Sequence, residues 1–301
     1  MTNIALLFVC LLVGMVLRAT KRVPDNTHLG VNGYLIHVAL PALILSQIHG
    51  LSLTPDLAFP VLMPWLLFSL SVLVFGGLSA VLRLTPSTAG ALILSAGLAN
   101  TSFVGLPMIE TFYGTGGLTT GLLIDQLGSY LVLGTLGIAV ACFCSQTEAS
   151  ARSIAFRIAT FPPLIALVLA LALYPITYPA WTSALLRRLG DTLAPLALVS
   201  VGLQLRLDQF AGHRVHLGLG LAFKLILGPL VLALLYVVVF QQKGGTTQIT
   251  LFEAAMGPMI GGAIVAIQHG LNPPLVTLMV GVGIALSFLT LPLWWLILLP
   301  L

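Results

Sequence analysis

The chain of 301 residues contains twelve Lys and Arg and eight Asp and Glu, while 58% of its residues are hydrophobic. Charged residues make up 7% of the chain, against about 25% in soluble proteins. This composition excludes a soluble globule and predicts an integral membrane protein without a separate water-soluble domain. The net charge of +4 implies no nucleic-acid partner, because basic loop residues are typical of membrane proteins.

Apolar stretches between the charged residues predict ten membrane-spanning helices, since one span needs about 20 mostly apolar residues. The first five are expected at residues 3–17, 31–48, 59–82, 85–112 and 118–144. A sixth ends near Tyr174, and the next three cover residues 188–205, 215–240 and 248–269. The tenth follows Asn272-Pro273-Pro274 and reaches Leu299. Residues 146–157 are expected to form a short cytoplasmic linker.

The basic residues are unevenly divided between alternate loops. Eight follow the odd-numbered helices, and three lie in the other loops: Arg18, Lys21, Arg22, Arg83, Arg152, Arg157, Arg206 and Arg214 against Arg187, Arg188 and Lys243. Cytoplasmic loops carry the excess of Lys and Arg. Both termini are therefore expected on the outer side of the cell membrane (inner or plasma membrane).

The ten spans divide into two halves of five, at residues 1–145 and 158–301. The sequence from Pro41 to Ser46 resembles that from Pro195 to Ser200, although chance similarity in an apolar background is an open alternative. An odd number of spans per half makes the two repeats inverted in the membrane. Inverted repeats are typical of secondary transporters.

The fourth and ninth predicted helices both contain residues that interrupt helices. Pro107 and Pro258 are expected to free the carbonyl groups of Phe103 and Ala254, because proline lacks an N–H. Gly105, Gly261 and Gly262 weaken the same helices further. Proline and glycine are also common in ordinary membrane helices. Interruptions at matching places in both halves nevertheless favour a binding site, where helix N-termini attract an anion and freed carbonyls attract a cation.

Three ionisable residues lie within the predicted spans, where such groups are costly and usually functional. Asp125, beside Gln126, is a candidate for cation or proton binding, with helix packing as the alternative. Lys224 either attracts a substrate carboxylate or neutralises Asp125. Glu253, close to the Pro258 interruption, is a minor candidate for cation coordination. Asp125, Gln126 and Glu253 are therefore the candidate sites for a coupling Na+ or H+.

The sequence contains no arrangement typical of an enzyme, a metal site or a cofactor site. The cysteines Cys10, Cys142 and Cys144 lie in apolar stretches, and His213 and His216 have no further ligand nearby. The common hydrolase, metalloprotease and phosphate-loop motifs are absent. A carrier is therefore preferred, and a channel or an intramembrane enzyme is the alternative.

Four segments of the chain resemble the auxin efflux carriers, which are relatives of the bile acid sodium symporters. These segments are Asn100–Pro107, Pro195–Gln204, Met256-Gly257-Pro258 and Leu289–Trp294. The resemblance implies an all-helical fold of two inverted five-helix repeats, in which the broken fourth and ninth helices cross at the substrate site. It also implies secondary transport of a carboxylate similar to auxin or malonate, and it permits a homodimer surrounded by membrane lipid.

The resemblance also assigns a role to Asn100, which is expected to bind the substrate carboxylate. Together with the interruptions, it predicts a substrate site formed by Asn100, Thr101, Ser102, Gly257, Pro258 and Lys224. Met256 stands where the second half would present a matching polar residue.

Overall fold

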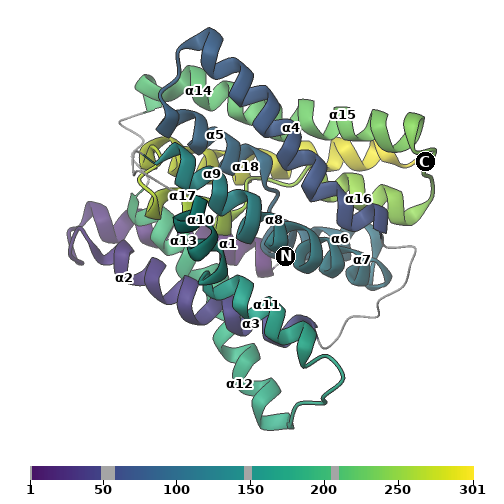
Figure 1. Ribbon diagram of the computed structural model, residues 1–301, viewed down its shortest axis with the longest axis horizontal. Coiled ribbons are helices and arrows are strands. Elements are labelled where there is room, and N and C mark those ends of the chain that lie inside the picture. The colour runs from purple at the N-terminus through teal and green to yellow at the C-terminus, as the bar shows by residue number, and fades with distance from the viewer. Residues whose placement is uncertain (1, 49–57, 146–150, 205–209) are drawn as a thin grey trace. The chain divides into compact units, whose positions relative to one another are not determined.

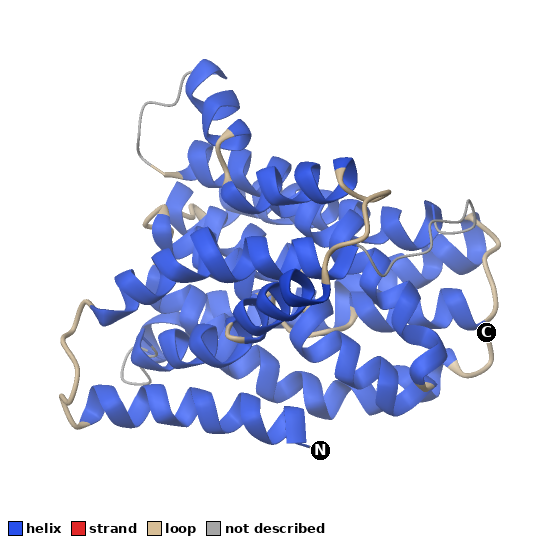
Figure 2. Cartoon of the chain, turned by 90° about the horizontal axis from the view of Figure 1, so that it is seen from below, coloured by secondary structure: helices blue, strands red, loops and turns tan. Residues whose placement is uncertain are grey.

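The computed structural model describes residues 2–48, 58–145, 151–204 and 210–301. These residues form helices and connecting loops without a β-strand, as Figure 2 shows. Five helices in the described part are long and apolar enough to cross a membrane: Thr27–Ser46, Ala58–Leu82, Leu118–Cys144, Phe210–Val239 and Pro273–Leu298. The prediction of an all-helical integral membrane protein is confirmed, whereas ten spans in inverted repeats stay a prediction.

The chain divides into two compact units. Unit 1 comprises Met1–Ser52 and Ser150–Leu205, and unit 2 comprises Leu53–Ala149 and Arg206–Leu301. Each unit thus combines residues from both predicted halves of the sequence.

Unit 1 contains α1 (Thr2–Ala19), α2 (Thr27–Tyr34), η1 (Leu35–Ala39), α3 (Leu40–Ile48), α10 (Ala151–Ala159), α11 (Pro162–Ala172), α12 (Ala180–Asp191) and α13 (Leu193–Gln204). In this unit α1 packs along α13, and α3 packs against both α11 and α12 (Figure 1). A Cβ atom on Gly14 would overlap the carbonyl oxygen of Val199, and one on Gly202 would overlap that of Leu11. The two glycines therefore allow α1 and α13 to touch backbone to backbone.

Two helical segments of unit 1 differ from the expected boundaries. Residues 151–157 of the predicted linker lie in α10, and residues 146–150 are outside the described part. The seventh span was expected to begin at residue 188, which lies inside α12. A separate helix, α13, begins at Leu193. A search for long apolar stretches misses α12, because it carries both Arg187 and Arg188 within twelve residues.

Unit 2 begins with α4 (Ala58–Leu82), α5 (Pro86–Gly97), η3 (Thr101–Gly105), α6 (Leu106–Tyr113), η4 (Thr115–Gly117), α7 (Leu118–Leu123), η5 (Ile124–Ser129), α8 (Tyr130–Val132), η6 (Leu133–Gly137) and α9 (Ile138–Cys144). It continues with α14 (Phe210–Ala222), η8 (Phe223–Leu227), α15 (Gly228–Leu234), η9 (Leu235–Val239), α16 (Gly245–Ala254), α17 (Ile260–Gln268) and α18 (Pro273–Leu298). The apolar helices α5, α17 and α18 pack on one another and form its buried core. Thr85 caps α5 by accepting a hydrogen bond from the Thr88 N–H.

Several long helices of unit 2 contain a π-helical turn. The turns η3, η5 and η8 contain the polar residues predicted to be functional, among them Thr101, Asp125 and Lys224. π-Helical turns are rare and often occur at functional sites. Their positions at Thr101, Asp125 and Lys224 therefore agree with the functional residues predicted from the sequence.

Candidate functional site

The two interrupted helices of unit 2 meet at their unwound segments. Ala99 and Pro258 form an antiparallel bridge. The Asn100 N–H donates to the Gly257 carbonyl at 2.8 Å, and the Met259 N–H donates to the Leu98 carbonyl at 3.0 Å. The interruptions on the two predicted helices therefore lie side by side, which places Asn100 beside Gly257 and Pro258. We call this region the crossing.

The first interruption lies earlier in the chain than the sequence predicts. The helix α5 ends at Gly97, and the chain turns helical again at Thr101, after Asn100. Pro107 and Gly105 lie within the continuous helical stretch formed by η3 and α6, so the prediction that they interrupt the helix is wrong. The wider π-helical turn directly before Pro107 accommodates its missing N–H without ending the helix.

The position of the first interruption follows from the side chain of Asn100. Its Oδ1 atom accepts hydrogen bonds from the N–H groups of Phe103 at 3.2 Å and Val104 at 3.3 Å. Asparagine is a preferred helix N-cap because it satisfies such free N–H groups. Asn100 is 1% exposed, and within the described residues its Nδ2 atom has no hydrogen-bond partner. The oxygen of the amide thus serves the helix, and the nitrogen is left to donate to a ligand.

The second interruption lies at Pro258. The helix α16 ends at Ala254, and α17 begins at Ile260. The Ala254 carbonyl accepts a hydrogen bond from Lys224 Nζ at 2.9 Å. A buried ammonium group therefore satisfies the carbonyl that proline leaves without its helical partner.

Gly261 and Gly262 do not form part of this interruption, contrary to the prediction. Both lie inside α17 and are buried. A Cβ atom on Gly262 would lie 2.9 Å from Leu98 Cδ1 and 3.2 Å from the Leu94 carbonyl oxygen. Gly262 instead allows close helix packing, since a side chain at this position would press on the backbone of α5.

Asp125 lies next to the crossing and is completely buried. Its Oδ1 atom accepts hydrogen bonds from the hydroxyl groups of Thr101 and Ser102, each at 2.5 Å. Its Oδ2 atom accepts one from Gln126 Nε2 at 2.8 Å. Thr101 and Ser102 were predicted to bind the substrate. Their hydroxyl groups instead donate hydrogen bonds to Asp125.

Lys224 and Glu253 are also completely buried, and Lys224 Nζ donates to the carbonyl of Ala254, the residue that follows Glu253. No ion pair within 4 Å joins Lys224 to Asp125 or Glu253 in the described part of the chain, so the prediction of a direct neutralising pair is not supported. Neither carboxylate oxygen of Glu253 has a hydrogen-bond partner among the described residues. Glu253 is thus a buried carboxyl group whose polar atoms the surrounding chain leaves unsatisfied.

The crossing has an electrostatic character that follows from its four helix ends. The C-terminal ends of α5 and α16 and the N-terminal ends of η3 and α17 all lie at the paired segments. Helix N-termini carry partial positive charge and C-termini partial negative charge. The N-terminal ends and the Asn100 amide nitrogen can bind an anion, while the Lys224 ammonium group already occupies the C-terminal end of α16.

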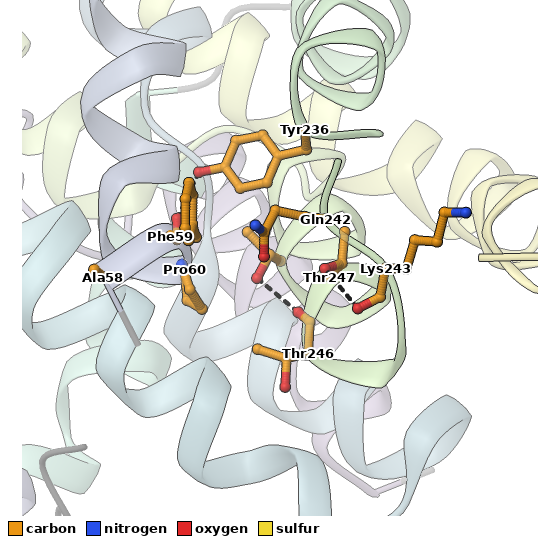
Figure 3. A pocket seen from close by; sticks show the side chains of 9 residues that line it. Ala58, Phe59, Pro60, Tyr236, Gln242, Lys243, Thr246 and Thr247 are labelled. Carbon is orange, nitrogen blue, oxygen red and sulfur yellow. Dashed lines mark hydrogen bonds between the residues drawn. The ribbon is translucent and has the colours of Figure 1, made fainter. Parts of the chain in front are cut away.

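A cavity of about 450 Å³ lies at the N-terminal end of α16, shown in Figure 3. It is lined by Ala58, Phe59, Pro60, Tyr236, Gln242, Lys243, Thr246, Thr247 and Thr250. Sequence reasoning missed this cavity, because its walls come from α4, η9 and α16, which are far apart in the chain. The run of three threonines on α16 is the only signal in the sequence that points toward it.

Comparison with known proteins identifies the family. The profile described as membrane transport protein matches residues 1–143 and 144–295. The chain belongs to this family, which is the auxin efflux carrier family. The resemblance noted in the sequence is thereby confirmed, and the protein is a membrane transport protein.

Two archaeal relatives extend over nearly the whole chain. An uncharacterized transporter of Methanothermobacter thermautotrophicus is 27% identical over 297 residues, which cover 95% of this chain and 94% of the relative. Another uncharacterized transporter, from Methanocaldococcus jannaschii, is 24% identical over 282 residues and 89% of each chain. The names of both relatives agree with transport and specify no substrate.

Proposed function

We propose that the protein is a secondary transporter that moves a small organic anion across the cell membrane by alternating access. The observation that carries this proposal is the buried Asn100 Nδ2 atom, an unpartnered donor located where two broken helices pair. A carboxylate at the crossing would accept a hydrogen bond from this nitrogen and would lie near the helix N-termini. The substrate is a mono- or dicarboxylate similar to auxin or malonate.

The remaining substrate contacts are proposed from the same paired segments. Gly257 and Pro258 lie beside Asn100, on the other of the two paired segments that form the crossing. Lys224 uses its ammonium group on the Ala254 carbonyl, and an ammonium group has three N–H donors. A second donor from Lys224 can therefore serve the substrate without breaking the first hydrogen bond. Thr101 and Ser102 contribute through Asp125, to which both donate.

The proposed transport cycle keeps the predicted membrane topology. Ten spans in two inverted repeats (residues 1–145 and 158–301), with both termini outside, give a crossing near the middle of the membrane that can open to either side. One group of helices moves against another around the crossing. Na+ or H+ is the proposed coupling ion, with Asp125, Gln126 and Glu253 as its candidate sites, and a homodimer is compatible with this mechanism.

Reconstitution tests the proposal directly. Purified protein in liposomes is expected to exchange a labelled carboxylate for unlabelled carboxylate, in a panel that includes malonate and indole-3-acetate. Protein-free liposomes control for diffusion of the undissociated acids. Folded protein without exchange of any carboxylate in the panel would contradict the proposal. Flux far above carrier turnover would indicate a channel, and a chemically altered substrate would indicate an enzyme.

A further inference from the structure

Glu253 differs from Asp125, the other buried acid in the described part of the chain, because no group donates a hydrogen bond to it. It lies in the last turn of α16, is 0% exposed, and has no hydrogen-bond partner on either oxygen. The carbonyl end of a helix carries partial negative charge. An ionised carboxylate at this place would therefore be unsatisfied by donors and also repelled by the helix to which it belongs.

The Glu253 carboxyl group lies close to two glycines, Gly105 and Gly121. A Cβ atom on Gly105 would lie 2.6 Å from both carboxyl oxygens, and one on Gly121 would lie 3.3 Å from Oε1. The same position on Gly121 also meets Leu106 and Ile109 side chains. Hard cations such as Na+ prefer several oxygen ligands, and the side chains of Leu106 and Ile109 offer none. A proton needs only the carboxyl group itself.

The charged groups near Glu253 come from other helices. Asp125 and Lys224 act on it electrostatically. The elements packed most extensively against α16 (α4, α7, α15, α18 and η4) contain no ionisable side chain. On α6, Tyr113 contacts Phe252 next to Glu253, while Glu110 is exposed. The buried cluster near the crossing thus consists of two acids and one base.

The charge count of this cluster favours one bound proton. If Asp125, Glu253 and Lys224 were all ionised, the cluster would carry one net negative charge in a region where an unpaired charge is costly. Asp125 accepts three hydrogen bonds, which stabilise its ionised form, whereas Glu253 accepts none. The proton therefore belongs on Glu253.

The cavity of Figure 3 lies on the same face of α16 as Glu253. Thr246, Thr250 and Glu253 are spaced four and three residues apart on α16, so they share one helical face. Thr246 and Thr250 line the cavity of Figure 3, and Glu253 lies about 4.5 Å further along the helix axis than Thr250. The polar wall of the cavity and Glu253 thus lie on the same face of α16, with Glu253 about one turn further from the helix N-terminus than Thr250.

We propose that Glu253 is the proton-binding site that couples the transporter to a pH gradient, while Asp125 stays ionised. The inference rests on the proposed function, since it assigns the coupling ion of that site. A carboxylate entering the crossing adds negative charge beside Asp125 and Glu253, so it binds more favourably when Glu253 is protonated. By thermodynamic linkage, the bound carboxylate then strengthens proton binding by the same factor. On release the O–H bond of Glu253 breaks and the proton returns to water.

Two measurements on the purified full-length protein test this assignment. In liposomes containing a pH-sensitive dye, inward flow of the transported carboxylate is expected to acidify the interior. Glu253→Gln keeps the size and neutral charge of the protonated group, so it should retain carboxylate exchange and lose the accompanying proton movement. The matched control Glu110→Gln, at the exposed glutamate of α6, should behave as the wild type. Replacing Na+ by choline should leave uptake unchanged.

The second measurement does not depend on transport. Infrared spectroscopy at neutral pH should show a protonated carboxyl band that shifts in protein made with isotope-labelled glutamate, of which the sequence has three: Glu110, Glu148 and Glu253. The band should persist in Glu110→Gln and in Asp125→Asn and vanish in Glu253→Gln. This readout remains valid on the wild type even if the Glu253→Gln variant does not fold.

Several outcomes would overturn the assignment. These are proton movement that survives in Glu253→Gln, uptake driven by a Na+ gradient at fixed pH, or a carboxyl band that ignores glutamate labelling. Wild-type protein that shows the glutamate band but exchanges no carboxylate would contradict the proposed function alone. The two ideas can therefore fail separately.

Discussion

The two interruptions at the crossing are built in different ways. At the first, between Gly97 and Thr101, the side chain of Asn100 caps the helix that follows it. At the second, Pro258 ends the hydrogen-bonding pattern of α16, and Lys224 from another helix supplies the missing donor to Ala254. One interruption is therefore satisfied from within its own segment, whereas the other depends on tertiary packing.

This difference indicates which interruption tolerates change. A local cap forms whenever its own helix forms, because its donor and acceptor are only three or four residues apart. A partner from a distant helix is present only in the folded protein. The second interruption should therefore lose more stability when its polar partner is removed.

Substitution of Lys224 is expected to have the largest effect. Lys224→Met removes the donor to the Ala254 carbonyl and the buried base of the cluster formed with Asp125 and Glu253. A hydrogen bond from a charged group contributes about 1.5 to 3 kcal/mol, so the free energy of unfolding should fall by at least this order. Thermal unfolding in detergent measures the loss. The exposed Lys243→Met is the matched control and should unfold as the wild type.

Transport by the Lys224 variant also separates two roles of the ammonium group. If Lys224 only completes the end of α16, the maximal rate should fall while the KM for carboxylate stays unchanged. If it also contacts the substrate, KM should rise. A variant with wild-type stability and wild-type kinetics would contradict any role at the second interruption.

Substitution of Asn100 is expected to affect transport more than stability. Asn100→Ala removes an N-cap, which costs about 1 kcal/mol, and removes the donor proposed for the substrate carboxylate. Loss of a charge-assisted hydrogen bond of about 1.5 to 3 kcal/mol corresponds to a roughly 10- to 100-fold weaker binding. Carboxylate affinity, measured by competition with labelled substrate, should fall in this range. Retention of wild-type affinity would remove Asn100 from the substrate site.

Substitutions of the two prolines are expected to have the smallest effects, and their comparison separates a proline at an interruption from one inside a helix. Pro258→Ala restores an N–H that can compete with Lys224 for the Ala254 carbonyl, so it should reduce the transport rate. Pro107→Ala changes a residue inside the helical stretch of η3 and α6. It should change the free energy of unfolding by only about 0.5 kcal/mol, the usual size for a substitution away from special structural features. Equal effects on transport would contradict the distinction between an interrupting and an accommodated proline.

The sequence predicted the helical class, both interrupted helices and the freed Ala254 carbonyl, because these depend on composition and on the missing N–H of proline. It could not predict that Lys224 reaches this carbonyl, since that contact joins residues 30 positions apart in the chain through packing. The misplaced first interruption had a local signal: Asn100 is a strong N-cap residue. Pro107, seven residues later, is the stronger helix-breaking residue by type, but it lies inside the helical stretch.

The roles of the hydroxyl residues illustrate the same limit. Sequence alone could not show that Asp125, on η5, accepts hydrogen bonds from the hydroxyl groups of both Thr101 and Ser102. Glu253 looked the weakest of the ionisable candidates because it lies near the end of its helix. Its isolation from donors becomes visible only when the glycines and aliphatic side chains around it are in place.

The π-helical turns described in unit 2 have a consequence for comparing this chain with its distant relatives. Each such turn holds one more residue than an α-helical turn, so the residues that follow it are rotated by about 100° relative to an uninterrupted helix. An alignment that crosses residues 101–105, 124–129 or 223–227 without a gap assumes the same extra residue in both proteins. A relative that lacks the insertion would have its equivalents of the buried polar groups shifted by one position. Single-residue gaps in sequence alignments of this family should therefore be tried first at these three turns.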